Sequence, residues 1–340
     1  MKTRINVLLL ICSMLMLCAC DKEVDETTTE TTQKAANFTG VIGEQFNMQS
    51  ITRMTNSTWE EGDAIGVFAM NHGTSLANGV YNNYSNVKYL TSDANGKFKA
   101  ATGDGILFNN KVLDFIAYYP YQSAISENKY IIDVSDQSNL GDIDLLYSEN
   151  ATNKSIVSSN VELKFDHMLS MLCIELEAGD GLNSLEGLTT KITNVRAEGS
   201  FNLSSKEILL NENVSEVTTI TSLVSAENSE KVKAISTAIL IPGQAINDFV
   251  VEFIVEGNKF EWKPQTNIIL QLGKRHTYKL KLTATGVVSI SSSSISDWDD
   301  VEGEEQDDLI VKPEGGSGDD GNNGENGDGG DDNGGEGGDN

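Results

Sequence analysis

Short runs of alternating or β-branched residues, separated by turn-forming residues, constrain this 340-residue chain more than any other feature. Val161-Glu162-Leu163-Lys164-Phe165 and His276-Thr277-Tyr278-Lys279-Leu280-Lys281-Leu282 alternate between apolar and polar side chains, which is the period of a half-buried strand. Ala94-Asn95-Gly96-Lys97 and Glu256-Gly257-Asn258-Lys259 carry the residues of tight hairpin turns. No strong amphipathic helix of 12 or more residues is present. The sequence therefore predicts an all-β fold built of sandwiches rather than parallel α/β units.

A change in composition suggests how the chain is divided. The polar, turn-rich stretch from Ala178 to Ser184 separates two strand-dense regions, so we expect one β-sandwich domain at 36–178 and a second at 182–298. From about residue 299 the chain has almost nothing to bury, and 12 of the 26 residues from Gly315 to Asn340 are glycine. We therefore expect residues 299–340 to form a disordered, acidic, Gly-rich tail.

The charge is concentrated at the C-terminal end. The segment from Asp297 to Asn340 has 17 acidic residues and one lysine, so it holds most of the formal net charge of −27. No basic face remains that would bind nucleic acid, and we exclude nucleic acid as a partner.

The first 19 residues have the pattern of an export signal. Lys2 and Arg4 precede an apolar run from Ile5 to Leu17, which is too short to span a bilayer as a helix. The run ends in Leu17-Cys18-Ala19-Cys20, which resembles the lipobox of bacterial lipoproteins, and Cys20 is the matching lipid-attachment position. An ordinary secreted protein cut after Ala19 is the alternative. Several acyl chains on Cys20 would hold the protein on a membrane stably.

An acidic, Thr-rich segment at 20–35 follows the signal. Its first residues, Asp21 to Glu26, resemble the stretch that directs lipoproteins of the Bacteroidetes to the outer face of the outer membrane. A solvated charged linker is the alternative interpretation. We expect a lipid-anchored protein exposed at the cell surface.

Residue types that support catalysis or cofactor binding are sparse. Once the signal is removed and Cys20 is lipidated, Cys173 is the one cysteine left, so no disulfide framework can form. Alternation places Leu172, Ile174 and Leu176 on one face and Cys173 on the other, which favours a small buried apolar role. None of the common hydrolase, P-loop or paired-cysteine metal motifs is present. We expect no enzyme activity, no cofactor and no metal site.

Isolated polar and aromatic residues have ordinary structural interpretations. His72, His167 and His276 are separated in sequence, and we interpret His167 as a structural histidine within a strand-like core segment. Asp142 and Asp144 are interpreted as solvated turn residues. The three tryptophans, Trp59, Trp262 and Trp298, could line a sugar-binding platform, although aromatic residues in sandwiches more often pack in the core or at its rim.

An ordered series of segments resembles the fimbrillin family of Bacteroidetes surface lipoproteins, which includes subunits of type V pili. The resemblance covers residues from about 36 to 298. Its segments are Thr52-Arg53, Trp59 to Phe68, Asp114 to Tyr121, Asp142 to Tyr147, Leu163 to Leu172, Leu272 to Leu280 and Ile295 to Trp298.

This resemblance implies two tandem transthyretin-like β-sandwich domains with Greek-key connections. It also implies assembly by donor-strand exchange, in which a protease removes an N-terminal strand and a strand of another subunit fills the groove. Phe38-Thr39-Gly40-Val41-Ile42 is the candidate removable strand, and Arg53 is the candidate processing site. Lys34 is a second candidate, and an exposed loop residue is the alternative for Arg53. The long acidic tail departs from the pattern of a polymerising stalk subunit, and tip, anchor or non-polymerising roles stay open.

The function that follows is pilus (fimbria) assembly or cell adhesion by a surface lipoprotein. Expected partners are the membrane, through the lipid anchor, other pilus subunits including further copies of this chain, and a host or bacterial surface ligand. The expected location is the outer membrane, or the fimbrium if the protein polymerises. The alternative function is a non-polymerising, glycan-binding surface lipoprotein of a nutrient-uptake system.

Overall fold

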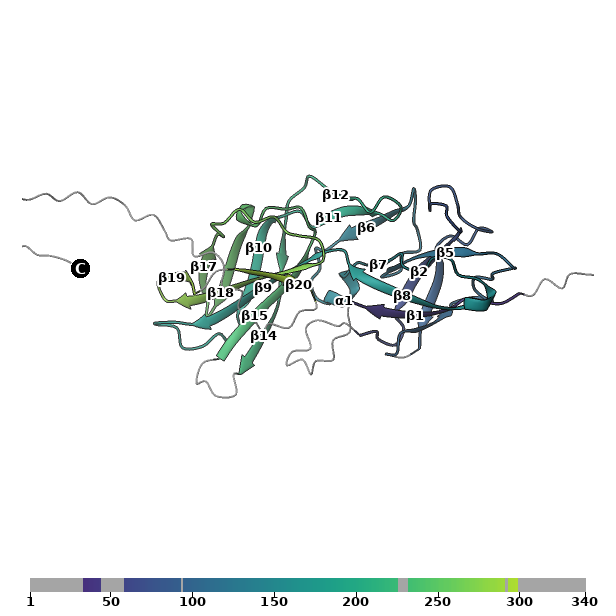
Figure 1. Cartoon of the computed structure of the whole chain (residues 1–340). Coiled ribbons are helices and arrows are strands. Elements are labelled where there is room, and N and C mark those ends of the chain that lie inside the picture. The colour runs from purple at the N-terminus through teal and green to yellow at the C-terminus, as the bar shows by residue number, and fades with distance from the viewer. Residues whose placement is uncertain (1–32, 44–57, 93, 226–231, 291–292, 299–340) are drawn as a thin grey trace, which may run out of the picture.

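The computed structural model describes residues 33–43, 58–92, 94–225, 232–290 and 293–298. Within these ranges the chain is made of strands joined by turns, with one short α-helix, α1 (Leu140–Ile143), and the 3-10 turns η1 (Ile156–Ser158) and η2 (Ile246–Asp248). Figure 1 shows two groups of strands side by side along the molecule. The all-β prediction is confirmed. Within the described ranges, no helix has the length and apolar character needed to cross a membrane.

The N-terminal group of strands forms a closed barrel. Its hydrogen-bonded order is β1-β4-β3-β2-β5-β7-β8. The strands are β1 (Asn37–Ile42), β2 (Ala64–Asn71), β3 (Val87–Thr91), β4 (Lys97–Ala100), β5 (Leu113–Tyr119), β7 (Leu146–Ser148) and β8 (Asn160–His167). The sequence predicts a sandwich here, whereas the ladder closes because β1 pairs with β4 on one edge and β8 on the other.

Alternation along the strands fills this barrel with apolar side chains. In β8 every second residue is buried, as the pattern of Val161, Leu163 and Phe165 predicts. These side chains belong to a cluster of buried residues that is rich in aromatic rings and draws on all seven strands. β1 therefore packs against the same core as the strands that follow it.

The C-terminal group of strands forms two sheets packed face to face. One sheet has the order β14-β15-β9-β18-β19, with β20 also paired to β18, and the other has the order β13-β10-β16-β17. The first contains β9 (Ser170–Ala178), β14 (Ile220–Ser225), β15 (Val232–Leu240), β18 (Lys274–Thr283), β19 (Gly286–Ser289) and β20 (Ser294–Asp297). The second contains β10 (Thr189–Val195), β13 (Ser215–Thr218), β16 (Val250–Val255) and β17 (Asn258–Trp262).

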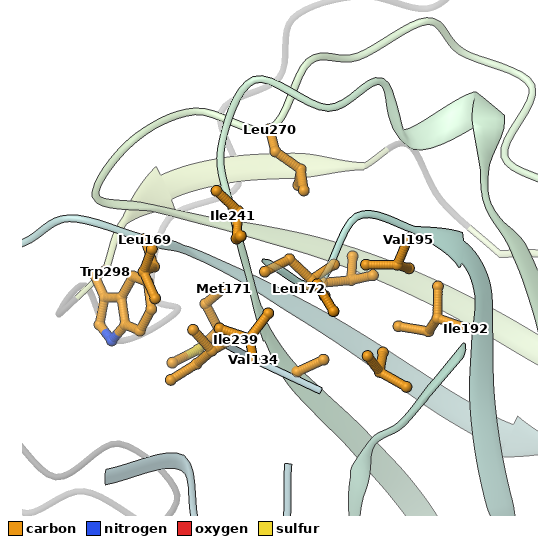
Figure 2. Close-up of a cluster of buried hydrophobic side chains, with 14 of the residues drawn as sticks. Val134, Leu169, Met171, Leu172, Ile192, Val195, Ile239, Ile241, Leu270 and Trp298 are labelled. Carbon is orange, nitrogen blue, oxygen red and sulfur yellow. The ribbon is translucent and has the colours of Figure 1, made fainter. Parts of the chain in front are cut away.

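The core of this sandwich lies between its two sheets. Leu172 of β9 and Ile192 and Val195 of β10 are buried in one cluster, and Figure 2 shows these side chains gathered between the strands. The hairpin between β16 and β17 turns at Glu256 and Gly257, which have φ values of 51° and 78°. The turn residues predicted from the sequence thus form the turn they specify.

A third, small sheet joins the two groups. It consists of β6 (Lys129–Asp133), β11 (Glu198–Asn202) and β12 (Ile208–Leu210), in the order β12-β11-β6. Gln137 adds a buried link, since its side-chain amide donates to the Ile239 carbonyl at 2.9 Å and accepts from the Ile239 N–H at 2.9 Å. The sandwich core continues through these elements to the outer face of the barrel.

The change from barrel to sandwich comes earlier in the chain than the predicted boundary at 178–182. β8 ends at His167 in the barrel, and β9 begins at Ser170 in the six-stranded sheet, where it pairs with β15 and β18. The turn-rich stretch from Ala178 to Ser184 instead connects β9 to β10, one sheet of the sandwich to the other. Strand pairing thus changes at Met168–Leu169, and the division into separate domains stays a prediction.

Candidate functional site

The first strand is enclosed on both edges, although it lies at the start of the fold. β1 runs parallel to β8 over its whole length, from the pair Asn37–Asn160 to the pair Ile42–Phe165. Its other edge pairs antiparallel with β4 at Phe38–Phe98 and Thr39–Lys97. β1 therefore occupies a central position in the ladder, and its removal would leave a gap with unpaired backbone groups on both sides.

Alternate side chains of β1 point into the barrel. Phe38 and Ile42 are 2% and 4% exposed. The Phe38 ring makes edge-to-face contacts with Tyr89 and Phe115, at centroid distances of 4.9 and 5.1 Å. Burial of an aromatic ring and a branched aliphatic side chain makes β1 a part of the core.

Gly40, midway between these two residues, lies directly beneath an indole ring. Trp59 Nε1 donates to the Gly40 carbonyl at 2.8 Å. A Cβ atom at Gly40 would lie 2.9 Å from Phe98, 3.0 Å from Trp59 and 3.1 Å from Phe165. Real Cβ atoms almost never approach a neighbour as closely as 2.9 Å, and the other two contacts are unusually tight, so a residue larger than glycine requires movement of the rings.

The ring above Gly40 is itself held firmly. Trp59 is 4% exposed and makes edge-to-face contacts with Phe98, Tyr119 and Phe165 at centroid distances of 4.9, 5.4 and 5.3 Å. Gly96, at the β3–β4 turn, has a φ of +65°, and a Cβ there would lie 2.3 Å from the Gly40 carbonyl oxygen. Two glycines thus let the backbone pass close to the indole.

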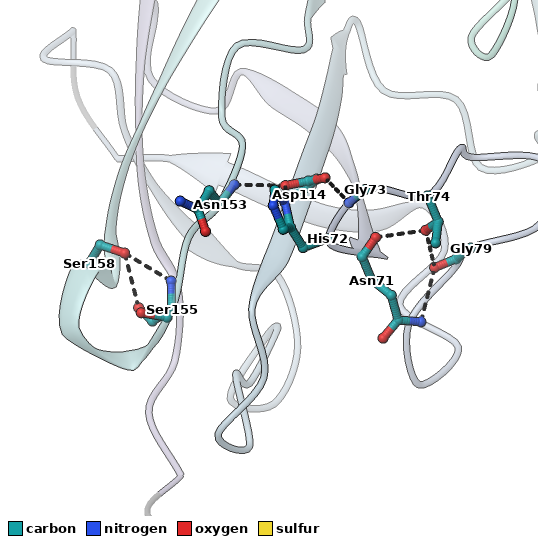
Figure 3. Close-up of polar contacts among 9 residues, drawn as sticks. All are labelled: Asn71, His72, Gly73, Thr74, Gly79, Asp114, Asn153, Ser155 and Ser158. Atoms are coloured by element: carbon teal, nitrogen blue, oxygen red, sulfur yellow. Dashed lines mark hydrogen bonds and ion pairs between the residues drawn. The ribbon is translucent and has the colours of Figure 1, made fainter.

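The space that β1 fills between β4 and β8 is called the groove below. Polar contacts hold the end of the groove where β1 begins. The Asn37 N–H donates to the Ser159 carbonyl at 2.8 Å, just before β8. The loop that leads to Ser159 is held by Asp114 of β5, which accepts from the Asn153 N–H at 2.7 Å and the Gly73 N–H at 2.8 Å (Figure 3). His72 Nδ1 lies 2.9 Å from the same carboxylate.

The charge of Asp114 is stabilised by these contacts. Burial alone would raise the pKa of Asp114, but the hydrogen bonds from Asn153, His72 and Gly73 lower it below its ordinary value. Within the same loop, the Ser155 N–H donates to Ser158 Oγ at 2.8 Å (Figure 3). An ionised carboxylate therefore ties two loops to β5 at this end of the barrel.

The opposite end of the groove, near Ile42, contains a second carboxylate, which is half-buried. Asp63 accepts from the Tyr119 hydroxyl at 3.0 Å and from the Glu60 N–H at 2.7 Å. Burial raises the pKa of Asp63 above its ordinary value, although these hydrogen bonds act in the other direction. A small cavity of about 60 Å³ lies here, lined in part by Ile42, Trp59 and Asp63.

The two site residues predicted from the sequence, Cys20 and Arg53, lie outside the described residues. The candidate strand Phe38–Ile42 is present as β1, one residue longer at its start. Lys34 is exposed, and its carbonyl accepts from the Phe108 N–H at 3.1 Å. A cut after Lys34 would leave β1 in the barrel, so Lys34 does not suit a role in strand removal.

Two other polar predictions have different outcomes. His167 is buried, as expected for a structural histidine, and its Nδ1 lies 2.9 Å from Asp144 Oδ2. Asp144 is predicted to be a solvated turn residue, but its carboxylate contacts the His167 imidazole and its side chain is only 13% exposed. Cys173 lies on the face opposite Leu172, as the alternation predicts, but it is half-buried and not fully buried as expected. Among the described residues, no group of three or more His, Cys, Asp or Glu side chains could hold a metal ion.

The three tryptophans do not form a common platform. Trp59 is buried in the barrel core. Trp298 is 3% exposed and belongs to the other buried cluster, which fills the sandwich. Trp262 is half-buried on β17, with its ring 5.1 Å from that of Tyr278. The arrangement gives no support to a sugar-binding surface made of tryptophan rings.

The contact between Gly40 and Trp59 could not have been found from the sequence. The two residues are 19 positions apart, and no periodic pattern links them. Glycine within an alternating strand is the one local signal, since it often marks a close approach of backbone or ring.

The chain is similar in sequence and structure to several known proteins. The sequence model of a family described as fimbrillin-like matches residues 52–298. A provisionally assigned fimbrium subunit of Bacteroides uniformis, Fim1C, is 30% identical over 307 residues, which cover 85% of this chain and 94% of the relative.

Two crystal structures are similar over most of their length. A provisionally assigned cell adhesion protein of Bacteroides uniformis has a TM-score of 0.59 at 29% identity, covering 71% of this chain and 93% of that protein. A provisionally assigned cell adhesion protein of Bacteroides ovatus has a TM-score of 0.61 at 21% identity, covering 78% and 98%. The second comparison shows a shared fold alone.

Proposed function

The chain belongs to the fimbrillin-like family, and from that premise we propose that it is a lipid-anchored subunit of a surface fimbria that assembles by strand replacement. In this proposal a protease cuts the chain at Arg53 and β1 leaves the barrel. A strand of another subunit then takes its place. The protein acts in fimbria assembly or adhesion through its interfaces, without catalysis.

The observation that carries the proposal is the position of β1. It is paired with β4 and β8, and its alternate side chains are buried, yet it precedes every other strand in the described residues. Without β1, apolar rings such as Tyr89, Phe98 and Phe115 would be exposed along a groove with unpaired backbone groups. Another strand satisfies both the rings and the backbone, so the groove would bind a strand in preference to other ligands.

Cleavage at Arg53 would have two consequences at once. The lipid on Cys20 and the strand β1 both precede Arg53 in the sequence. One cut would therefore separate the rest of the subunit from its covalent membrane anchor and open its groove. An uncut molecule would keep its anchor and a filled groove, which suits a subunit at the base of a fimbria.

The test is mass spectrometry of the protein purified from cell-surface fractions, compared with an Arg53→Ala variant. We expect a mature N-terminus immediately after residue 53 in the parent and a lipidated Cys20 on intact chains of the variant. A Lys34→Ala variant is the matched control, because it removes a basic residue that precedes β1 and should mature like the parent.

Equal maturation of the parent and the Arg53→Ala variant would show that processing does not require Arg53. A lipidated Cys20 on every parent molecule would mean that β1 is never removed. That result would assign the protein to an anchoring role and contradict strand replacement in this subunit.

A further inference from the structure

The groove filled by β1 is selective at its centre. We infer that a strand able to replace β1 must carry glycine opposite Trp59, between a bulky apolar residue and a branched aliphatic one. We further infer that this strand comes from a different protein rather than from the C-terminal strands of a second copy. The inference rests on the strand replacement proposed above and deepens it by stating which partner strand fits.

The rule follows from three inward-facing positions on β1. Phe38 fills a site between the rings of Tyr89 and Phe115. Ile42, at 4% exposure, fills the far end beside the small cavity. Between them, the site at Gly40 has no room for a Cβ, since three rings lie 2.9 to 3.1 Å from its place. The groove therefore fits a strand with the residue order bulky–x–Gly–x–aliphatic, running in the direction of β1.

The narrow central site does not depend on a side chain of β1. Trp59 contacts the rings of Phe98, Tyr119 and Phe165, all of which belong to other strands. Its one hydrogen bond to β1 is made to a backbone carbonyl, which any incoming strand supplies. The indole can thus donate a hydrogen bond to the backbone of any incoming strand, but its ring leaves space at this position for glycine alone.

The outward-facing positions have no comparable restriction. Asn37 is exposed, and Thr39 and Val41 are half-buried on the outer face of the barrel. Substitutions at these positions should leave the inward-facing contacts intact. They provide matched controls on the same strand.

The sequence tells which strands of this chain meet the rule. Phe38 to Ile42 is the one segment in which glycine follows a bulky apolar residue by two positions and precedes a branched aliphatic residue by two. In β20 and the residue after it, the residues at the same spacing are Ser294, Ser296 and Trp298, which offer neither the glycine nor the large first residue. Processed copies would have lost β1, so they could not supply the fitting strand to one another.

The test uses the full chain with a specific protease site inserted within residues 44–57. After the cut, brief exposure to urea and dilution allow exchange of the N-terminal piece for a fluorescent peptide of residues 34–43. Binding is measured by fluorescence anisotropy. The other peptides carry Gly40→Ala, Gly40→Val or Thr39→Val, or span residues 290–298 with β20.

We expect the parent peptide to bind, the alanine peptide to bind about tenfold more weakly and the valine peptide about a hundredfold more weakly. The Thr39→Val peptide should bind within about twofold of the parent. A Trp59→Leu receptor should reduce the penalty of the valine peptide, because the smaller side chain opens the central site.

The failures are distinguishable. If the parent peptide does not bind, strand replacement is contradicted, and the glycine rule that depends on it is contradicted too. If the parent and the valine peptides bind equally, strand replacement stands and the glycine rule is wrong. If the peptide with β20 binds as tightly as the parent, the partner need not be a different protein, and that part is overturned.

Discussion

The first and last described strands, β1 and β20, close the two halves of the molecule in different ways. β1 pairs on both edges and buries Phe38, Gly40 and Ile42 in the barrel core. β20 pairs with β18 alone, and none of its four residues is buried. Chain ends are often dispensable edges, but here the N-terminal strand is a core element and the C-terminal strand is an edge.

This contrast bears on function because strand replacement needs a strand whose loss matters. Loss of an edge strand exposes one row of backbone groups, whereas loss of β1 exposes two rows and an aromatic groove. The large energetic cost of an empty barrel is the driving force available for binding a replacement strand.

The largest effect should come from truncating the core residue of β1. Phe38→Ala removes a buried ring that contacts Tyr89 and Phe115, and we expect a loss of about 3–5 kcal/mol in the free energy of unfolding. Ile295→Ala in β20, where the side chain is 41% exposed, should cost about 0.5 kcal/mol or less. Urea unfolding measures both. Equal losses would erase the distinction between the two strands.

A smaller loss should follow from adding volume at the centre of β1. Gly40→Val places carbon atoms against Phe98, Trp59 and Phe165, and overpacking of this kind costs about 1–3 kcal/mol. Thr39→Val, on the outer face, is the control and should change the free energy of unfolding by about 0.5 kcal/mol or less. A stable Gly40→Val protein would show that the rings move aside easily.

Mild acid should weaken the sandwich before the barrel. Burial lowers the pKa of His276 in β18 to about 4, so this histidine stays neutral in the folded chain. As the pH falls below about 6.5, the unfolded state takes up a proton and the folded state does not. Stability is therefore lost between pH 6.5 and about 4, by about 2 kcal/mol at pH 5.

Hydrogen exchange at pH 7 and pH 5 separates the two halves. Protection of amides in β9, β15 and β18 should fall at pH 5, and a His276→Gln variant should reduce that dependence on pH. A loss that affects β1 and β8 as strongly as the sandwich would contradict the assignment to His276.

A loss of about 1–2 kcal/mol is expected from Asp114→Asn at the start of the groove. The amide cannot accept from both the Asn153 and Gly73 N–H groups, so one of these two part-buried hydrogen bonds is lost. Exchange of the Asn37 amide, which bonds to Ser159 in the loop beyond Asn153, should rise in the variant. Unchanged exchange there would mean that the loop is held by other contacts.

Local patterns predicted the elements better than their long-range pairing. Alternation identified β8 from Val161 to Phe165, and turn residues identified the hairpin at Gly257. Neither pattern indicates that β1 lies parallel to a strand more than 120 residues later, because parallel pairing leaves no local turn signal. The contact of the Asp144 carboxylate with His167 was missed for the same reason, since it depends on tertiary placement.

The smallest effect on the barrel should come from the residue that holds the end of β20. Trp298 is 3% exposed and its ring stacks on His167 at the end of β8, 4.4 Å away, while its carbonyl accepts from Arg275 at 2.6 Å. Figure 2 shows the indole beside Leu169, at the edge of the sandwich cluster. Trp298→Ala should release β20 locally, so that amides of its ladder with Lys274–Thr277 exchange faster while barrel amides keep their protection. Faster exchange throughout β8 and β1 would contradict this prediction. It would show that Trp298 supports the groove through its contact with His167, and that β1 and β20 are energetically coupled.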